Sequence, residues 1–157
     1  MTLDCRMERH LLILECTRRK SKITKPIPAW NRYIGGSFPV LKYLHKQNML
    51  PSTIDIMVIS AKYGLIEVTE LIDNYDLKLT RSISVNLREK VLRKLKHKLK
   101  QNRYSSVLLL IEGAYFEPLR GYEVILNKYN IPYMKAHPKD SLYSLTYWFK
   151  QFLYPRE

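Results

Sequence analysis

The stretch that decides the fold runs from Ile54 to Leu79 and reads IDIMVISAKYGLIEVTELIDNYDLKL. Its apolar start, residues 54–59, stops abruptly at the polar patch Ser60-Ala61-Lys62-Tyr63-Gly64. Ligands of α/β proteins bind outside the carboxyl ends of parallel strands. A buried strand that ends in Ser, Lys, Tyr and Gly therefore indicates a ligand site at this point, although the pattern does not identify its chemistry.

Two other apolar runs repeat this pattern. Residues 11–16 (LLILEC) lead into the basic loop Thr17-Arg18-Arg19-Lys20, and residues 107–111 (VLLLI) lead into Glu112-Gly113-Ala114-Tyr115. Short, continuous apolar runs are typical of strands that are buried on both faces of a parallel sheet. We expect the three strands to end at one edge of a sheet, where their loops would meet.

Helical patterns alternate with these strands. Four helices are expected to begin at residues that are typical of helix starts: Ser37, Asn86, Pro118, and Asp140 or Ser141. A fourth, short strand is expected within residues 131–136. The alternation predicts a single domain, residues 1–157, of the α/β class, with a small, mainly parallel sheet of three to four strands flanked by helices.

The composition favours a cytoplasmic protein. With 157 residues and 46% hydrophobic residues, the chain can bury a core without a metal or disulfide staple. Two cysteines, Cys5 and Cys16, are too few for a disulfide framework, which favours a reducing compartment. The apolar runs are far shorter than the roughly 20 residues that span a bilayer. The N-terminus lacks the apolar segment of a signal peptide.

The net charge of +13, from 27 basic and 14 acidic residues, attracts polyanions. Nucleic acid, either DNA or RNA, is therefore the expected partner, and a nucleotide or nucleobase is a related small ligand. An anionic membrane surface is a second interpretation. An ordinary lysine-rich surface is a third.

The segment that follows Asn86 concentrates this charge. Leu87, Val91, Leu95 and Leu99 form an apolar stripe at helical spacing. The remaining positions are mostly basic, and we expect six of them to contact phosphates: Arg88, Arg93, Lys94, Lys96, Lys98 and Lys100. Only Glu89 breaks the sign, so ion pairs within the helix do not explain the charge. The alternative is a solvated outer face.

The three strand-end loops supply the candidate site. The residues expected to bind a ligand are Thr17, Arg18, Lys20, Ser60, Tyr63, Gly64, Tyr75, Asp76, Gly113 and Tyr115. Glu112 is the candidate general acid or base, Lys62 a candidate for holding negative charge, and Cys16 a candidate for contacting the substrate. Each also has a structural interpretation: Cys16 as a small buried hydrophobe, Lys62 as a surface lysine, and the tyrosines as core rings.

Metal and cofactor chemistry is not expected. The four histidines are scattered without the spacing of metal ligands. No glycine-rich phosphate loop of the Walker or dinucleotide type is present. The sequence therefore predicts neither a metal site nor a bound cofactor.

Segments at these loops resemble the YaaA peroxide-stress family and related small α/β domains. Residues 58–66 (VISAKYGLI) and 70–79 (ELIDNYDLKL) are similar to its Ser-x-x-Tyr-Gly…Asp-Leu-Ile-x-Pro-Tyr-x-Leu pattern, with Asn74 in place of the proline. Residues 109–119 (LLIEGAYFEPL) resemble its strand-then-Tyr-Phe segment, and residues 29–38 (AWNRYIGGSF) resemble a segment of the small domains. The resemblance implies an α/β fold, a site at these loops, and DNA binding.

The first loop, residues 16–20 (CTRRK), also resembles the Cys-Ser-x-x-Lys motif of a domain in archaeosine synthases, with Thr17 in place of serine. Those enzymes add an amine to the nitrile of a deazaguanine base in transfer RNA. We therefore expect a nucleic-acid-binding protein whose strand-end pocket accommodates a base. The alternatives are an enzyme that acts on nucleic acid or on a modified, deazaguanine-like nucleobase, and an interaction protein with a vestigial pocket.

Overall fold

A computed structural model describes residues 8–154, and its centre is a sheet of five strands in the order β4-β3-β1-β6-β7. The strands are β1 (Arg9–Glu15), β3 (Ile54–Ser60), β4 (Gly64–Glu67), β6 (Tyr104–Leu110) and β7 (Tyr133–Ala136). β1 pairs in parallel with β3 and β6, and β6 pairs in parallel with β7. Only β4 is antiparallel to its neighbour, β3. The predicted α/β class with a mainly parallel sheet is confirmed, with one strand more than expected.

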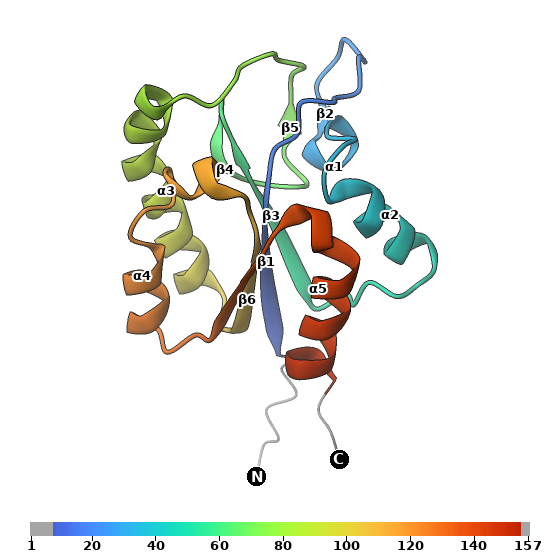
Figure 1. Cartoon of the computed structure of the whole chain (residues 1–157), viewed down its shortest axis with the longest axis vertical. Helices are drawn as coiled ribbons and strands as arrows, with labels where there is room; N and C mark the ends of the chain where they lie inside the picture. The colour runs from blue at the N-terminus through green and yellow to red at the C-terminus, as the bar shows by residue number, and fades with distance from the viewer. Residues whose placement is uncertain (1–7, 155–157) are drawn as a thin grey trace.

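Helices cover both faces of the sheet (Figure 1). One face carries α1 (Ala29–Arg32), α2 (Phe38–Lys46) and α5 (Ser141–Trp148), which continues as a π-helical turn, Phe149–Leu153. The other face carries α3 (Arg81–Gln101) and α4 (Tyr122–Lys128). A small ribbon pairs β2 (Ile27–Pro28) with β5 (Leu71–Ile72), and 3₁₀ turns lie at Gly113–Phe116 and Pro138–Asp140.

Alternate residues of each central strand enter opposite cores. In β1, Leu12 and Leu14 pack on the side of α2 and α5, whereas Leu11 and Ile13 pack on the side of α3 and α4. All four side chains are at most 1% exposed. This double burial is the reason that the strand has a continuous apolar sequence rather than an alternating one.

The polar patch at residues 60–64 is the turn of a hairpin between β3 and β4. The Ser60 hydroxyl oxygen accepts hydrogen bonds from the backbone N–H groups of Lys62 (3.2 Å) and Tyr63 (3.1 Å). Gly64 pairs with Ser60 and has a φ angle of +77°, which disfavours other residues. The hairpin explains why an apolar strand stops at this patch and reverses.

Two predicted helix starts are wrong. α3 begins at Arg81, where the Thr80 side chain accepts a hydrogen bond from Ile83 N (3.2 Å), and Asn86 lies inside the helix. α4 begins at Tyr122 rather than at Pro118, after a bend at Gly121, whose φ angle is +101°. α3 thus begins at a local side-chain cap, and α4 begins after a glycine in the left-handed region.

The other two starts are confirmed. Ser37 precedes α2, although its hydroxyl bonds the Ser141 hydroxyl (2.6 Å) instead of capping the helix. Asp140 precedes α5. Within residues 8–154, no helix is both long enough and apolar enough to cross a membrane.

Candidate functional site

The carboxyl ends of β1 and β6 open into a cavity of about 410 Å³, here called the strand-end cavity. It is lined by Glu15, Cys16, Thr17, Arg18, Gly36, Glu112, Tyr115, His137, Pro138 and Lys139. The first and third predicted loops therefore meet, because parallel strands bring their carboxyl ends to one edge. Two segments that the sequence analysis did not assign, at Gly36 and at residues 137–139, complete the wall.

Glu15 is the functional candidate that the sequence analysis missed. Its Oε1 accepts a hydrogen bond from the backbone N–H of Glu112 (2.6 Å), so the side chain lies between the ends of β1 and β6. Burial, opposed by this hydrogen bond, raises the pKa of Glu15 to about 7. A carboxyl group that titrates near neutral pH is suited to proton transfer. Glu15 is thus a second carboxyl at this edge beside Glu112, the predicted general acid or base.

Glu112 itself is exposed and pairs with a histidine. His137 Nε2 lies 3.4 Å from Glu112 Oε1, and His137 Nδ1 accepts a hydrogen bond from the backbone N–H of Lys139 (3.1 Å). This acceptor role places the ring proton on Nε2, toward the carboxylate, when the imidazole is neutral. The adjacent Gly113 is exposed in the 3₁₀ turn that follows β6.

Cys16 and Tyr115 meet on the cavity wall. The Cys16 sulfur lies 3.2 Å from the Tyr115 hydroxyl, and the thiol is almost completely buried. Burial and the neighbouring thiol raise the pKa of Tyr115 far above its ordinary value. Tyr115 therefore keeps its proton and can donate a hydrogen bond to the thiol or to a ligand.

Several other predicted residues gather around Tyr75, outside the lining of the strand-end cavity. The Tyr75 hydroxyl is 2.8 Å from the Ser60 hydroxyl and 2.6 Å from the Tyr33 hydroxyl. Lys20 Nζ lies 4.4 Å and Lys62 Nζ 5.9 Å from the centre of the Tyr75 ring. These four contacts define the Tyr75 cluster, in which two cations lie over one aromatic ring.

Tyr33 is a second missed member. It is fully buried, and burial raises its pKa to about 12, so the chain of hydroxyls from Tyr33 through Tyr75 to Ser60 stays protonated at neutral pH. Burial also lowers the pKa of Lys20. Asp76, which was expected to bind a ligand, is exposed one residue beyond Tyr75.

Tyr63 does not line the strand-end cavity but a second one. Its ring packs edge-on against Tyr75, with centroids 5.6 Å apart, and its hydroxyl accepts a hydrogen bond from Asp73 N (3.2 Å). It also lines a cavity of about 470 Å³ between β4 and α3. The same cavity is also lined by Leu65, Ile66, Glu70, Lys90, Arg93, Lys94 and His97.

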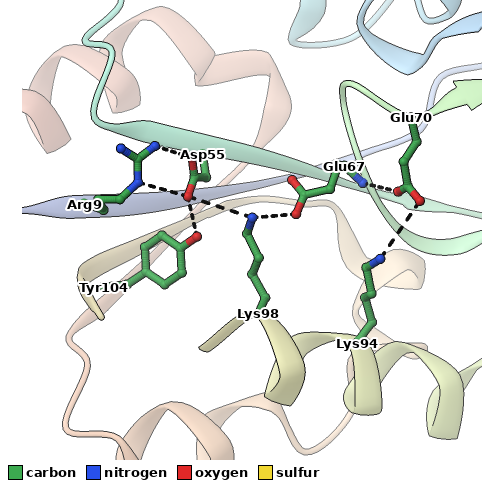
Figure 2. A network of polar contacts seen from close by, with 7 residues as sticks. All are labelled: Arg9, Asp55, Glu67, Glu70, Lys94, Lys98 and Tyr104. Carbon is green, nitrogen blue, oxygen red and sulfur yellow. Dashed lines mark hydrogen bonds and ion pairs between the residues drawn. The ribbon is translucent and has the colours of Figure 1, made fainter. Parts of the chain in front are cut away.

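Part of the charge on α3 is neutralised by carboxylates from elsewhere in the fold. Figure 2 shows the side chain of Lys98, from α3, between Asp55 of β3 and Glu67 of β4. Its Nζ lies 2.5 Å from Glu67 Oε1 and 3.9 Å from Asp55 Oδ2. Lys94 Nζ lies 4.0 Å from Glu70 Oε1. The Lys98 side chain is only 12% exposed, so its ammonium group forms a structural ion pair with Glu67 rather than a contact with phosphate.

Two more of the six basic residues are also paired. Arg88 binds Glu117 (2.7 Å), and Arg93 binds Glu89 one turn earlier on the helix (2.7 Å). Only the Arg93–Glu89 pair lies within the helix, as expected from its single acidic residue; Arg88, Lys94 and Lys98 are paired with carboxylates from outside α3. Lys96 and Lys100 are exposed and form no salt bridge within residues 8–154.

The cations at the strand-end edge are different. Arg18 and Lys139 line the strand-end cavity, and Lys20 and Lys62 lie over Tyr75. In the described part of the chain, none of these four forms a salt bridge. An anionic ligand at this edge can therefore contact these cations without breaking an ion pair of theirs.

A buried arginine fixes the loop that carries two of these cations, Arg18 and Lys20. Arg32 is fully buried, and its guanidinium donates to the carbonyl oxygens of Ser21 (2.7 Å), Ile23 (2.8 Å), Lys25 (2.9 Å) and Ile72 (3.1 Å). The loop after β1 is thus held against β5 by one side chain. Sequence analysis gave no reason to assign this role to Arg32.

A metal site is not evident at this edge. Among the residues that the structure describes, no group of three or more His, Cys, Asp or Glu side chains is placed to hold a metal ion. The donors at the cavity are instead those of an organic or phosphorylated ligand: a carboxyl, hydroxyls, an imidazole and cations.

The fold and the strand-end cavity define a small α/β protein with a ligand-sized hollow at the carboxyl edge of its sheet. Residues 11–146 match the model of DUF6884, a family of unknown function, and the chain belongs to this family.

Among solved structures, the chain is similar to the crystal structure of AF0587, a protein of unknown function, with a TM-score of 0.52 and 14% sequence identity. The similarity covers 96% of this chain and 46% of that chain, so this chain spans about half its length. At this identity the similarity shows the fold alone. No curated protein matches the chain.

Proposed function

We propose that the protein binds nucleic acid at the strand-end edge, with one base in the strand-end cavity and phosphates on the surrounding cations. The observation that carries this proposal is the cavity itself, whose lining combines the Glu15 carboxyl, with a pKa of about 7, with the cations of Arg18 and Lys139. The DNA-binding activity that the resemblance to YaaA implies agrees with this proposal.

The cavity has the size and donor set for a base. Its volume of about 410 Å³ falls within the roughly 300–1,000 Å³ that is typical of small-molecule sites. Base edges present hydrogen-bond donors and acceptors side by side. Glu15 Oε1 is held by Glu112 N, so Oε2 is the oxygen for a ligand, and it can accept or, when protonated, donate. The Tyr115 hydroxyl supplies a second donor.

The phosphate contacts are those cations that lack a protein carboxylate. Arg18 and Lys139 lie at the cavity, and Lys20 and Lys62 lie at the neighbouring Tyr75 cluster. On α3, Lys98 is committed to Glu67, and Lys100 lies beside Tyr104, at the amino edge of the sheet. The helix therefore contributes less to binding in this proposal than its sequence suggests.

The test is the salt dependence of binding to a fluorescein-labelled single-stranded oligonucleotide, measured by anisotropy. Each neutralised phosphate contributes about −0.7 to the log–log slope for a single strand. The wild-type slope is expected to be steeper than about −2, and R18A/K139A should make it shallower by about 1.4. The matched control is K46A/K128A, which removes two exposed cations from α2 and α4 and should leave affinity nearly unchanged. A wild-type slope shallower than about −2, or equal effects of the two pairs, would contradict the proposal.

A second candidate function is an enzyme that acts on nucleic acid or on a modified, deazaguanine-like nucleobase. The observation that favours it is that a carboxyl with a pKa of about 7, Glu15, and the buried thiol of Cys16 line the same cavity. In that function Glu15 rather than Glu112 moves the proton, while Lys62 and Lys20 hold negative charge near Tyr75.

This candidate is tested by product analysis. Transfer RNA and DNA are incubated with the protein, digested to nucleosides and compared by mass spectrometry. A change in nucleoside mass that is lost in E15Q and retained in E123Q, an exposed control on α4, would support the enzyme. An equal change in both variants would exclude Glu15 from the chemistry.

A further inference from the structure

An aromatic platform that the site above does not use lies on α5. Tyr143 and Tyr147 are one helical turn apart, with ring centroids 6.4 Å apart and planes inclined by 17°. They are 72% and 43% exposed. Exposed aromatic rings of this kind are the platforms on which nucleobases stack in single-strand-binding proteins. With Met134 and Ala136 of β7 they line a cavity of about 360 Å³, here called the α5 cavity.

The α5 cavity adjoins the strand-end cavity. His137 lines both, so the two cavities meet at this residue. Three lysines lie around the two cavities: Lys135 lines the α5 cavity, Lys139 lines the strand-end cavity, and Lys150 is exposed one turn beyond Tyr147. Asp140 is the one carboxylate in the lining of the α5 cavity, whereas Glu15 and Glu112 line the strand-end cavity. The lysines offer contacts to phosphates between the two cavities.

We infer that the ligand is a single-stranded segment of nucleic acid at least two nucleotides long, with neighbouring bases turned into the two cavities. One base enters the strand-end cavity, and the next stacks on Tyr143 and Tyr147. Every base has a π-face, so this second contact tolerates any sequence. This inference rests on the proposed function and names its substrate class.

A duplex does not fit this arrangement. In a double helix, neighbouring bases are stacked on one another at about 3.4 Å per step. Two bases that enter the two cavities, on either side of His137, must instead be splayed apart. Unstacked bases of this kind are the usual targets of aromatic side chains in single-strand recognition. The structure therefore favours a single strand, of DNA or RNA, over a double helix.

The competing explanation is that the tyrosines only stabilise the helix. Residues four apart on a helix are neighbours, and aromatic pairs at this spacing add slightly to helix stability. In that case, loss of the rings would change the melting temperature a little and leave nucleic-acid affinity unchanged. Affinity therefore separates the two explanations.

The experiment compares ligands of increasing length against paired variants. Nucleoside monophosphates, single-stranded DNA and RNA hexanucleotides, and a duplex are titrated into the wild type, Y143A/Y147A and Y143F/Y147F. The control is Tyr43→Ala, which removes a 55% exposed tyrosine from α2. We expect Y143A/Y147A to weaken hexanucleotide binding roughly 5- to 100-fold, with monophosphate binding unchanged. Y143F/Y147F and the control should bind like the wild type.

The outcomes separate this inference from the proposed function. If monophosphates bind but hexanucleotide affinity is the same in Y143A/Y147A as in the wild type, the inference fails and the proposed base site in the strand-end cavity is retained. The same holds if a duplex binds as tightly as a single strand. If the wild type binds neither monophosphates nor hexanucleotides, both fail. Should Y143A/Y147A not fold, photocrosslinking of a 5-iodouridine hexanucleotide to the wild type decides: adducts on Tyr143 or Tyr147 support the inference, and adducts elsewhere only overturn it.

Discussion

Replacing Glu15 with glutamine is expected to stabilise the protein at alkaline pH and to have little effect at acid pH. Burial raises the pKa of Glu15 to about 7, so the folded state holds this proton more tightly than the unfolded state does. The stabilisation is complete below the unfolded pKa and is lost as the pH rises through the folded pKa. A glutamine at this position does not titrate, yet its side-chain oxygen can still accept the hydrogen bond from Glu112 N.

The size of the effect follows from the two pKa values. The pKa rises from an ordinary value of 4.5 to about 7, and each pKa unit corresponds to about 1.4 kcal/mol. The stabilisation lost when both states have released the proton is therefore about 3.5 kcal/mol before screening. Because the side chain is only half-buried and partly screened by solvent, we expect about 1–2 kcal/mol to be observed.

Urea unfolding of the wild type and the E15Q variant at pH 4, 6, 7 and 8 measures this effect. The difference between their unfolding free energies cancels the titration of all other groups, and it should grow in favour of the variant between about pH 4.5 and pH 7. E123Q, a change at an exposed carboxylate on α4, should show no such trend. A constant difference between the wild type and E15Q, or a directly measured pKa of Glu15 near 4.5, would refute the reasoning.

Three further substitutions test the framework around the site. Arg32→Lys should lower the free energy of unfolding by about 2–3 kcal/mol, because an ammonium group cannot serve all of the buried carbonyls; Arg19→Lys, at an exposed neighbouring position, should change it by less than about 0.5 kcal/mol. Gly64→Ala should cost about 1 kcal/mol in the same assay because its φ angle is +77°, whereas Gly113→Ala, where a Cβ meets no atom within 4 Å, should be neutral or slightly stabilising. For Asp55, burial alone would raise the pKa, but hydrogen bonds from Arg9 and Tyr104 hold it below its ordinary value. The stabilisation is therefore present above the unfolded pKa of about 4 and lost at lower pH, so Asp55→Asn should destabilise at pH 7 and approach the wild type near pH 3 in urea unfolding.

The strands were predictable because their chemistry is local. Continuous apolar runs that are bounded by polar residues gave β1, β3 and β6 to within a few residues. β4 was not predicted, since four residues after a glycine carry too little pattern to be separated from a loop. The start of α3 was misplaced because Asn86 and Glu89 resemble a capping box, whereas Thr80, which caps the helix, lacks that partner.

The site was predictable only in part. Parallel pairing of the central strands made it reasonable that the loops after them would converge, and Cys16, Glu112 and Tyr115 do share one cavity. Gly36 and His137 reach the same cavity through tertiary packing, which no spacing in the sequence encodes. Glu15 could have been found, because a charged residue at the end of an otherwise apolar run is the signature of a functional group on a buried strand.

The distribution of ion pairs gives the electrostatic reason to place the ligand at the carboxyl edge. Asp55 lies near the start of β3 and binds Arg9 and Tyr104, which begin β1 and β6, and Lys98 joins it from α3 (Figure 2). The Asp55 carboxylate at the amino edge is thus already paired. The carboxyl edge keeps Arg18, Lys20, Lys62 and Lys139, which form no salt bridge within residues 8–154. These cations lie at the strand-end cavity and at the Tyr75 cluster beside it, so a polyanion bound at this edge can contact them without displacing a carboxylate from any of them.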